Sequence, residues 1–248
     1  MRLGKIEYLN LIIFDIFIKK YPASSSFKYG LHLKKSYPSK LSYDYLFGRI
    51  DAGFISSITE PKSLYKSPHG AGSRLGIIAQ KEVWSVLVLH EDSSNDYQSA
   101  TSNALCKVLD LNGRVLIGDR ALGYFYTKKS DLDSKKDSKD FTDMAWAWYE
   151  KNRLPFVFGR LCFHGSNDFY EAMTKDFIKK IGSGKKYKGI KIPHYIIMKY
   201  VTKLNIDKDF ARKYIEKIFY VINSKERAAL KRFYRSLRLK GIKSPKRF

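Results

Sequence analysis

Residues 75–89 read LGIIAQKEVWSVLVL, two apolar runs separated by the polar tripeptide Gln80-Lys81-Glu82. The tripeptide predicts a kink between two extended segments. The second run, residues 83–89, lacks the alternation of polar and apolar residues that a strand with one face in water shows. We therefore expect this run to be buried on both sides, in a parallel or mixed sheet that helices cover.

Ser85 is the polar side chain inside that second run. A lone serine in a buried strand is most often hydrogen-bonded to nearby backbone. The alternative is that the strand passes a cleft and that the Ser85 hydroxyl points into it. The run alone favours the backbone-bonded interpretation, and the choice depends on the rest of the chain.

Strand and helix patterns alternate on the amino-terminal side of this stretch. Apolar, extended segments predict strands at residues 2–8 and 50–55, and helices are expected at residues 9–21 and 39–47. This alternation is typical of a doubly wound α/β sheet.

Two polar residues follow the expected strand ends, Asn10 after the first strand and Ser56 after the second. Ligands of open α/β sheets bind beyond the carboxyl ends of the strands, so both residues are candidates for binding. Asn10 also stands where a side-chain amide caps a helix, which is its more ordinary role.

Three hydroxyl side chains, Ser99, Thr101 and Ser102, stand just ahead of a helical run at residues 103–109. Ordinary N-capping accounts for one of these hydroxyls, not three. Free backbone N–H groups and the helix dipole both favour negative charge at such a start. The segment therefore predicts an anion-binding site.

Asp119 ends the next expected strand, residues 114–119, and precedes a helix that begins at Arg120-Ala121. Its carboxylate suits a general acid or base in a cleft, or a helix cap, and the cap is the more ordinary role. The remaining patterns predict a short strand at 31–35, a solvent loop at 127–140, a helix at 143–152, a strand at 154–159, and helices at 166–181, 207–222 and 224–237.

The chain has 248 residues and a formal net charge of +23. Such a charge suits nucleic acid, an anionic membrane surface or an acidic small molecule. The lysines are spread over nearly every segment, and no zinc-finger, RNP or helix-turn-helix pattern is present, so specific nucleic-acid binding is not expected. No apolar run reaches about 18 residues, and the start MRLGKIEYLN lacks the pattern of a signal peptide. We expect a cytoplasmic protein without membrane insertion.

The sequence also lacks the patterns that hold metals or nucleotides. It contains no P-loop, G-x-G-x-x-G or H-E-x-x-H motif, and its 5 histidines lack ligand spacing. Cys106 and Cys162 stand far apart, as reduced structural thiols do. We expect neither a metal nor a cofactor.

Six groups of residues stand in a characteristic order: GKIEYLN at 4–10, YPS at 37–39 with RIDAGFIS at 49–56, GII at 76–78 with EVWSVL at 82–87, SATS at 99–102, LIGDRAL at 116–122 and LPFVF at 154–158. Together they resemble chorismate dehydratase, the first enzyme of the futalosine route to menaquinone. The resemblance covers residues 2 to about 163. It implies a type II periplasmic-binding-protein-like α/β fold, with mixed sheets flanked by helices and a ligand cleft between two lobes.

The resemblance further implies how the chain divides between those lobes. Residues 1–86 plus 163–248 would form the first lobe, and residues 87–162 the inserted second lobe, with crossings near 83–90 and 157–165.

The same resemblance assigns catalytic roles to Asn10 and Ser85, and substrate binding to Ser56, Thr101, Ser102 and Asp119. The implied reaction is a hydro-lyase reaction without a cofactor, which converts chorismate to 3-[(1-carboxyvinyl)oxy]benzoate and water. The matched motifs contain no histidine, and their carboxylates, Glu7, Asp51, Glu82 and Asp119, have ordinary structural roles open to them. This suggests the substrate's own enolpyruvyl carboxylate as the base.

Two alternatives stay open. One is a lyase like 1,4-dihydroxy-6-naphthoate synthase, although Tyr8-Leu9-Asn10 differs from the Cys-Pro-Asn-Asp pattern at that enzyme's start. The other is a cytoplasmic binding protein for a small anionic metabolite.

Overall fold

The computed structural model describes residues 1–59, 74–90, 96–132, 140–165, 168–182 and 189–245. Within these ranges the core contains a sheet of order β1-β2-β7-β3-β8 and a smaller sheet of order β5-β4-β6. The strands of the larger sheet are β1 (Leu3–Gly4), β2 (Ala52–Ser56), β7 (Phe156–Phe163), β3 (Leu75–Ala79) and β8 (Ile218–Val221). The strands of the smaller sheet are β5 (Arg114–Ile117), β4 (Val86–Leu89) and β6 (Phe141–Asp143).

The stretch at residues 75–89 runs from one sheet into the other. Its first run forms β3, its second run ends in β4, and the predicted kink between them is confirmed. All nine residues of these two strands are buried. β1 and β2 pair in parallel and the other pairs are antiparallel, so the expected mixed sheet is also confirmed.

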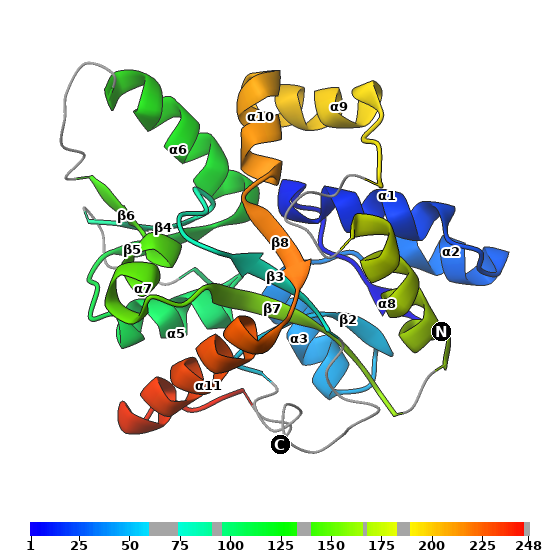
Figure 1. Ribbon diagram of the computed structural model, residues 1–248, viewed down its shortest axis with the longest axis horizontal. Helices are drawn as coiled ribbons and strands as arrows, with labels where there is room; N and C mark the ends of the chain where they lie inside the picture. Colours follow the sequence, from blue (N-terminus) through cyan, green and yellow to red (C-terminus); the bar gives the residue numbers. More distant parts are fainter. Residues whose placement is uncertain (60–73, 91–95, 133–139, 166–167, 183–188, 246–248) are drawn as a thin grey trace.

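Helices cover both sheets, and Figure 1 shows them in two groups. On the side of the larger sheet lie α1 (Ile12–Lys20), α2 (Ser25–Leu33), α3 (Pro38–Leu46) and α8 (Asp168–Ile181). On the side of the smaller sheet lie α5 (Ala100–Val108), α6 (Gly118–Leu132) and α7 (Met144–Asn152). α11 (Ser224–Leu239) contacts both β7 and α5, and α9 (His194–Leu204) and α10 (Lys208–Ile215) contact each other next to α6. No helix in the described ranges is long and apolar enough to cross a membrane.

The lobe boundaries expected from the sequence, 1–86 plus 163–248 and 87–162, stay a proposal. The place of β7 in the larger sheet suggests a different position for the second boundary. β7 lies between β2 and β3 in the larger sheet and pairs with both. We therefore propose that the chain returns to the first lobe before Phe156, ahead of the expected crossing at 157–165.

Three secondary-structure predictions were wrong, and for β8 the deciding contacts are distant in sequence. Residues 31–33 end α2 instead of starting a strand, and Lys35 makes only an isolated bridge to Lys5 within the described residues. The predicted helix at 207–222 ends at Ile215, and the next residues form β8, which pairs with β3. The predicted loop at 127–140 is helical up to Leu132.

Other predictions at the ends of elements have mixed outcomes. Residues 133–139 of the expected loop and residue 166, the expected start of α8, lie outside the described residues. α9 was not predicted at all, although it is helical from His194 to Leu204.

Candidate active site

A cavity lies where the two sheets meet, and both sheets supply its walls. The larger sheet contributes Ile77 of β3 and Phe158 of β7, and the smaller sheet contributes Val86 of β4 and Ile117 of β5. The cavity measures about 50 Å³, which is room for a few water molecules. A ring-sized ligand therefore requires the walls to move apart.

Asn10 lies on this cavity in a short 3-10 turn, Leu9–Leu11, that leads into α1. The N-cap residue of α1 is Leu11, and no side chain caps the helix, so the capping interpretation of Asn10 was wrong. The side-chain Oδ1 of Asn10 is buried and has no hydrogen-bond partner among the described residues. Such an unpaired oxygen costs about 1–3 kcal/mol, and a donor on a bound ligand would remove that cost.

Ser85 stands immediately before β4 and is 1% exposed. Ser85 is among the residues that line the cavity. Its Oγ accepts a hydrogen bond from the Tyr214 hydroxyl at 2.8 Å. The carbonyl oxygen of Ser85 accepts the Gly118 N–H at 2.8 Å. The interpretation as a backbone-bonded core hydroxyl is therefore replaced by the cleft interpretation.

The crossing segment ahead of Ser85 is held by Asp143, whose role the sequence did not indicate. One carboxylate oxygen accepts the backbone N–H groups of Val83 and Trp84 at 2.8 and 2.7 Å. The other oxygen caps α7 through the N–H groups of the helix start. Burial raises the pKa of Asp143, and these backbone donors oppose that rise. Asp143 thus fixes the strand position from which Ser85 faces the cavity.

Trp84 makes the second anchor of this crossing. Its backbone has a φ of 62°. Its ring stacks with Phe125 of α6 and with Phe210 of α10, at a centroid distance of 5.2 Å in each case, and these two rings lie 6.2 Å from each other. This stack connects the smaller sheet's helix to the carboxyl-terminal region, and it brings α10 close to Ser85.

The predicted anion site at residues 99–102 is only partly brought to the cavity. Ser99 is the N-cap of α5, and its Oγ accepts the Ser102 N–H at 3.1 Å. Ser99 and Ser102 both line the cavity. Thr101 does not; its Oγ accepts the Ile58 N–H at 3.4 Å, which ties α5 to the turn after β2.

Ser56 and Asp119, the other two predicted binding residues, have different positions. Ser56 ends β2, is buried, and lines the cavity. Asp119 does not line it. Its carboxylate accepts the Leu9 N–H at 2.9 Å and pairs with Lys203 at 2.8 Å, so it holds the turn that carries Asn10.

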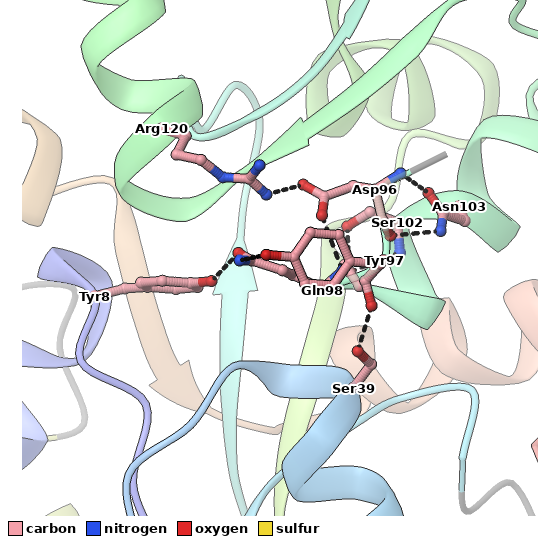
Figure 2. A network of polar contacts seen from close by, with 9 residues as sticks. Tyr8, Ser39, Asp96, Tyr97, Gln98, Ser102, Asn103 and Arg120 are labelled. Atoms are coloured by element: carbon pink, nitrogen blue, oxygen red, sulfur yellow. Dashed lines mark hydrogen bonds and ion pairs between the residues drawn. The ribbon is translucent and has the colours of Figure 1, made fainter. Parts of the chain in front are cut away.

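A polar network closes one rim of the cavity, and Figure 2 shows it from close by. The Tyr8 hydroxyl donates to the Gln98 side chain at 2.8 Å, and the Ser39 hydroxyl donates to the Tyr97 carbonyl at 2.5 Å. Asp96 pairs with Arg120 at 2.5 Å in the same network. Burial raises the pKa of Tyr8, which keeps its hydroxyl protonated as a donor.

A larger groove of about 650 Å³ lies on the other side of Tyr8, which lines both spaces. The groove is lined by the cationic residues Lys35, Arg120 and Lys203 and by the carboxylates Glu7 and Asp119. Lys35 pairs with Glu7, Lys203 with Asp119 and Arg120 with Asp96. Tyr8, whose hydroxyl is bonded to Gln98, thus lies between the groove and the enclosed cavity.

Among the described residues that line the cavity, every polar side chain is neutral. They are the Asn10 amide and the hydroxyl groups of Tyr8, Ser56, Ser85, Ser99 and Ser102. No histidine, cysteine, carboxylate or cation is among its described lining residues. The arrangement can bind and orient an anion through hydrogen bonds, but the described lining offers no strong base.

Comparisons with known proteins agree on a family and a fold. A family model described as menaquinone biosynthesis matches residues 95–238. The chain is similar to the chorismate dehydratase of Campylobacter jejuni subsp. jejuni serotype O:23/36 (strain 81-176), with 40% identity over 239 residues, 95% of this chain and 97% of that protein.

Two solved structures resemble the fold at low sequence identity. A protein from Archaeoglobus fulgidus matches with a TM-score of 0.53 and 15% identity, over 97% of each chain. An ABC transporter structure from Parabacteroides distasonis matches with a TM-score of 0.54 and 15% identity, over 99% of this chain and 96% of that one. The expected α/β fold of the periplasmic-binding-protein-like type, with helices flanking mixed sheets, is confirmed.

Proposed function

Since this chain belongs to the menaquinone-biosynthesis family that includes chorismate dehydratase, we propose that it converts chorismate to 3-[(1-carboxyvinyl)oxy]benzoate and water. The enzyme is then a hydro-lyase, and its place is the futalosine route. The relative at 40% identity over nearly the whole chain carries this proposal. The cytoplasmic location expected from the sequence stays a prediction.

The neutral cavity supports a mechanism in which the substrate supplies the base. Chorismate loses the proton at C3 and the hydroxyl group at C4, and the electron pair of the C3–H bond becomes part of an aromatic ring. The enolpyruvyl carboxylate accepts the C3 proton and passes it to the hydroxide that leaves C4, which becomes water. Aromatisation drives the reaction, so the protein mainly has to hold the substrate in the reactive geometry.

Asn10 and Ser85 are the residues that we assign to holding the enolpyruvyl carboxylate near C3. They lie on two different elements that face the same cavity, and each has a donor for a carboxylate, the amide Nδ2 of Asn10 and the hydroxyl of Ser85. The unpaired Asn10 Oδ1 is an acceptor and would take a donor of the substrate instead. Ser56 and Ser102, at the end of β2 and the start of α5, are assigned to the ring carboxylate, with Ser102 close to the positive end of the helix dipole.

Two other predicted binding residues receive modified roles in this proposal. Asp119 supports the turn that carries Asn10, and Thr101 supports the position of α5. Neither is needed to touch the substrate. Substrate entry past Tyr8 requires the rim network to open, and its closure excludes water during the reaction.

The test mixes the purified protein with chorismate, without added cofactor, and follows products by chromatography with mass detection. We expect a product lighter than chorismate by one water. Ser85→Ala and Asn10→Ala should each reduce turnover by about 100-fold, as the loss of a hydrogen bond to a reacting charge does. Ser57→Ala is the matched control, because its buried hydroxyl donates to the Val157 carbonyl at 2.7 Å and does not line the cavity.

Two outcomes would contradict the proposal. Loss of activity in Asp119→Asn, while both Ser85→Ala and Asn10→Ala stay active, would overturn the residue assignment. Absence of product together with thermal stabilisation by chorismate would favour a binding protein or a lyase that resembles 1,4-dihydroxy-6-naphthoate synthase.

A further inference from the structure

Tyr214 is a buried hydroxyl that the assigned mechanism does not yet use. It lies on α10, is 1% exposed, and donates to the Ser85 Oγ at 2.8 Å across a separation of 129 residues. α10 presents Phe210 and Tyr214 to the protein interior, and Phe210 stacks on Trp84. The helix is thereby fixed against the crossing segment that carries Ser85.

The hydrogen bond from Tyr214 restricts what the Ser85 hydroxyl can do. A serine hydroxyl has one proton to donate and two lone pairs that accept. Tyr214 donates to one of those lone pairs. Among the described residues no acceptor is recorded for the Ser85 proton, and the cavity is the open direction beside it.

The hydrogen-bond geometry makes Tyr214 the donor of this pair. Burial raises the pKa of Tyr214 well above its ordinary value, so the phenol stays protonated near neutral pH. The protonated phenol therefore has a proton to donate, and its oxygen lies 2.8 Å from the accepting Ser85 Oγ. Chains of hydrogen bonds polarise one another, so this donation also strengthens the hydrogen bond that Ser85 itself gives.

We propose that Tyr214 is a positioning residue that turns the Ser85 hydroxyl proton into the cavity, toward a carboxylate oxygen of the substrate. The inference rests on the proposed function and adds a residue to it. Tyr214 acts only through Ser85. Its removal should therefore matter only when the Ser85 hydroxyl is present.

The experiment is a double-mutant cycle on the full chain with Tyr214→Phe and Ser85→Ala. Tyr214→Phe keeps the ring and removes only the hydroxyl. We expect kcat to fall about tenfold, because the Ser85 proton is no longer oriented toward the substrate. A tenfold fall corresponds to a rise of about 1.4 kcal/mol in the activation free energy. Because the substrate's other contacts remain, KM should change less than kcat. In the Ser85→Ala background, Tyr214→Phe should have no further effect on turnover.

Two measurements separate positioning from a structural role. If Tyr214 only stabilises the fold, Tyr214→Phe lowers turnover by the same factor with and without Ser85, and this outcome overturns the inference. If the turnover of Ser85→Ala is below detection, the chorismate affinities of wild type, both single variants and the double variant are measured by calorimetry and compared in the same double-mutant cycle. Tyr21→Phe is the matched control, since the Tyr21 hydroxyl donates to Asp176 at 3.0 Å and does not line the cavity.

The failure of this inference is distinct from the failure of the proposed function. Wild-type protein that dehydrates chorismate, with Tyr214→Phe equal to it in kcat, overturns the role of Tyr214 alone. Wild-type protein that neither dehydrates nor binds chorismate overturns the proposed function, and with it the inference.

Discussion

Gly118→Ala should destabilise the protein because Gly118 combines an unusual backbone conformation with a close neighbour. Its φ is 61°, in the left-handed region where side chains are rarely found. A Cβ atom at this position would lie 2.6 Å from Cε2 and 2.7 Å from Cδ2 of the Tyr8 ring. The Tyr8 hydroxyl is bonded to Gln98, so the ring cannot move without loss of that contact.

The expected cost follows from these two effects. The left-handed conformation costs an ordinary residue about 1–2 kcal/mol. An added methyl group in a packed site costs about 1–3 kcal/mol through displaced neighbours. Together they predict a loss of about 2–5 kcal/mol in the free energy of unfolding, and a fall of roughly 5–15 °C in Tm for a chain of this length.

The assay is urea denaturation followed by circular dichroism, with turnover of chorismate measured on the same preparations. Turnover should fall as well, because Gly118 and Tyr8 both line the cavity. Gly123→Ala on the same helix is the matched control. The nearest atom to its Cβ position is the Leu204 carbonyl oxygen, at an ordinary 3.7 Å. Alanine is the better helix former, so this variant should gain up to about 1 kcal/mol. Equal unfolding midpoints for Gly118→Ala and wild type would refute the reasoning.

Two further predictions concern the core and the helix caps. Trp148 is fully buried, whereas Trp146 on the same helix is 39% exposed. Trp148→Phe should therefore lower the free energy of unfolding by about 2–3 kcal/mol, and Trp146→Phe by less than about 0.5 kcal/mol. Equal losses of the two variants in urea denaturation would contradict this. Asp207 caps α10, and the Phe210 backbone N–H that donates to it lowers the pKa of its carboxyl below the ordinary 3.8. A lowered pKa in the folded state stabilises the protein above the unfolded-state pKa, and this contribution is lost as the pH falls through the folded-state value. Asp207→Ala should therefore lower the free energy of unfolding by about 0.5–1 kcal/mol at pH 7. The difference from wild type should shrink below about pH 4. A constant difference from pH 7 to pH 2 would show that the charge plays no part.

The sequence by itself determined the fold class and the place where the chain passes between the sheets. The uniformly apolar run after Gln80-Lys81-Glu82 had to be buried on both faces, and the polar tripeptide had to interrupt the strand. Both features are local properties of the chain. The structure accordingly has β3 and β4 on either side of the tripeptide. The helix at 143–152 was also predicted from local signals, and α7 occupies Met144–Asn152.

Only the tertiary structure decided which polar groups meet. Asp119 looked like a cap or an acid, but its carboxylate accepts the Leu9 N–H, 110 residues away, and pairs with Lys203. Tyr214 had no local signal at all, since only the packing of α10 on Trp84 brings its hydroxyl to Ser85. β8 was missed for the same reason, because its hydrogen bonds go to β3 and not to its sequence neighbours. Local pattern encodes burial and helix ends, whereas a hydrogen bond between distant residues depends on how whole elements pack.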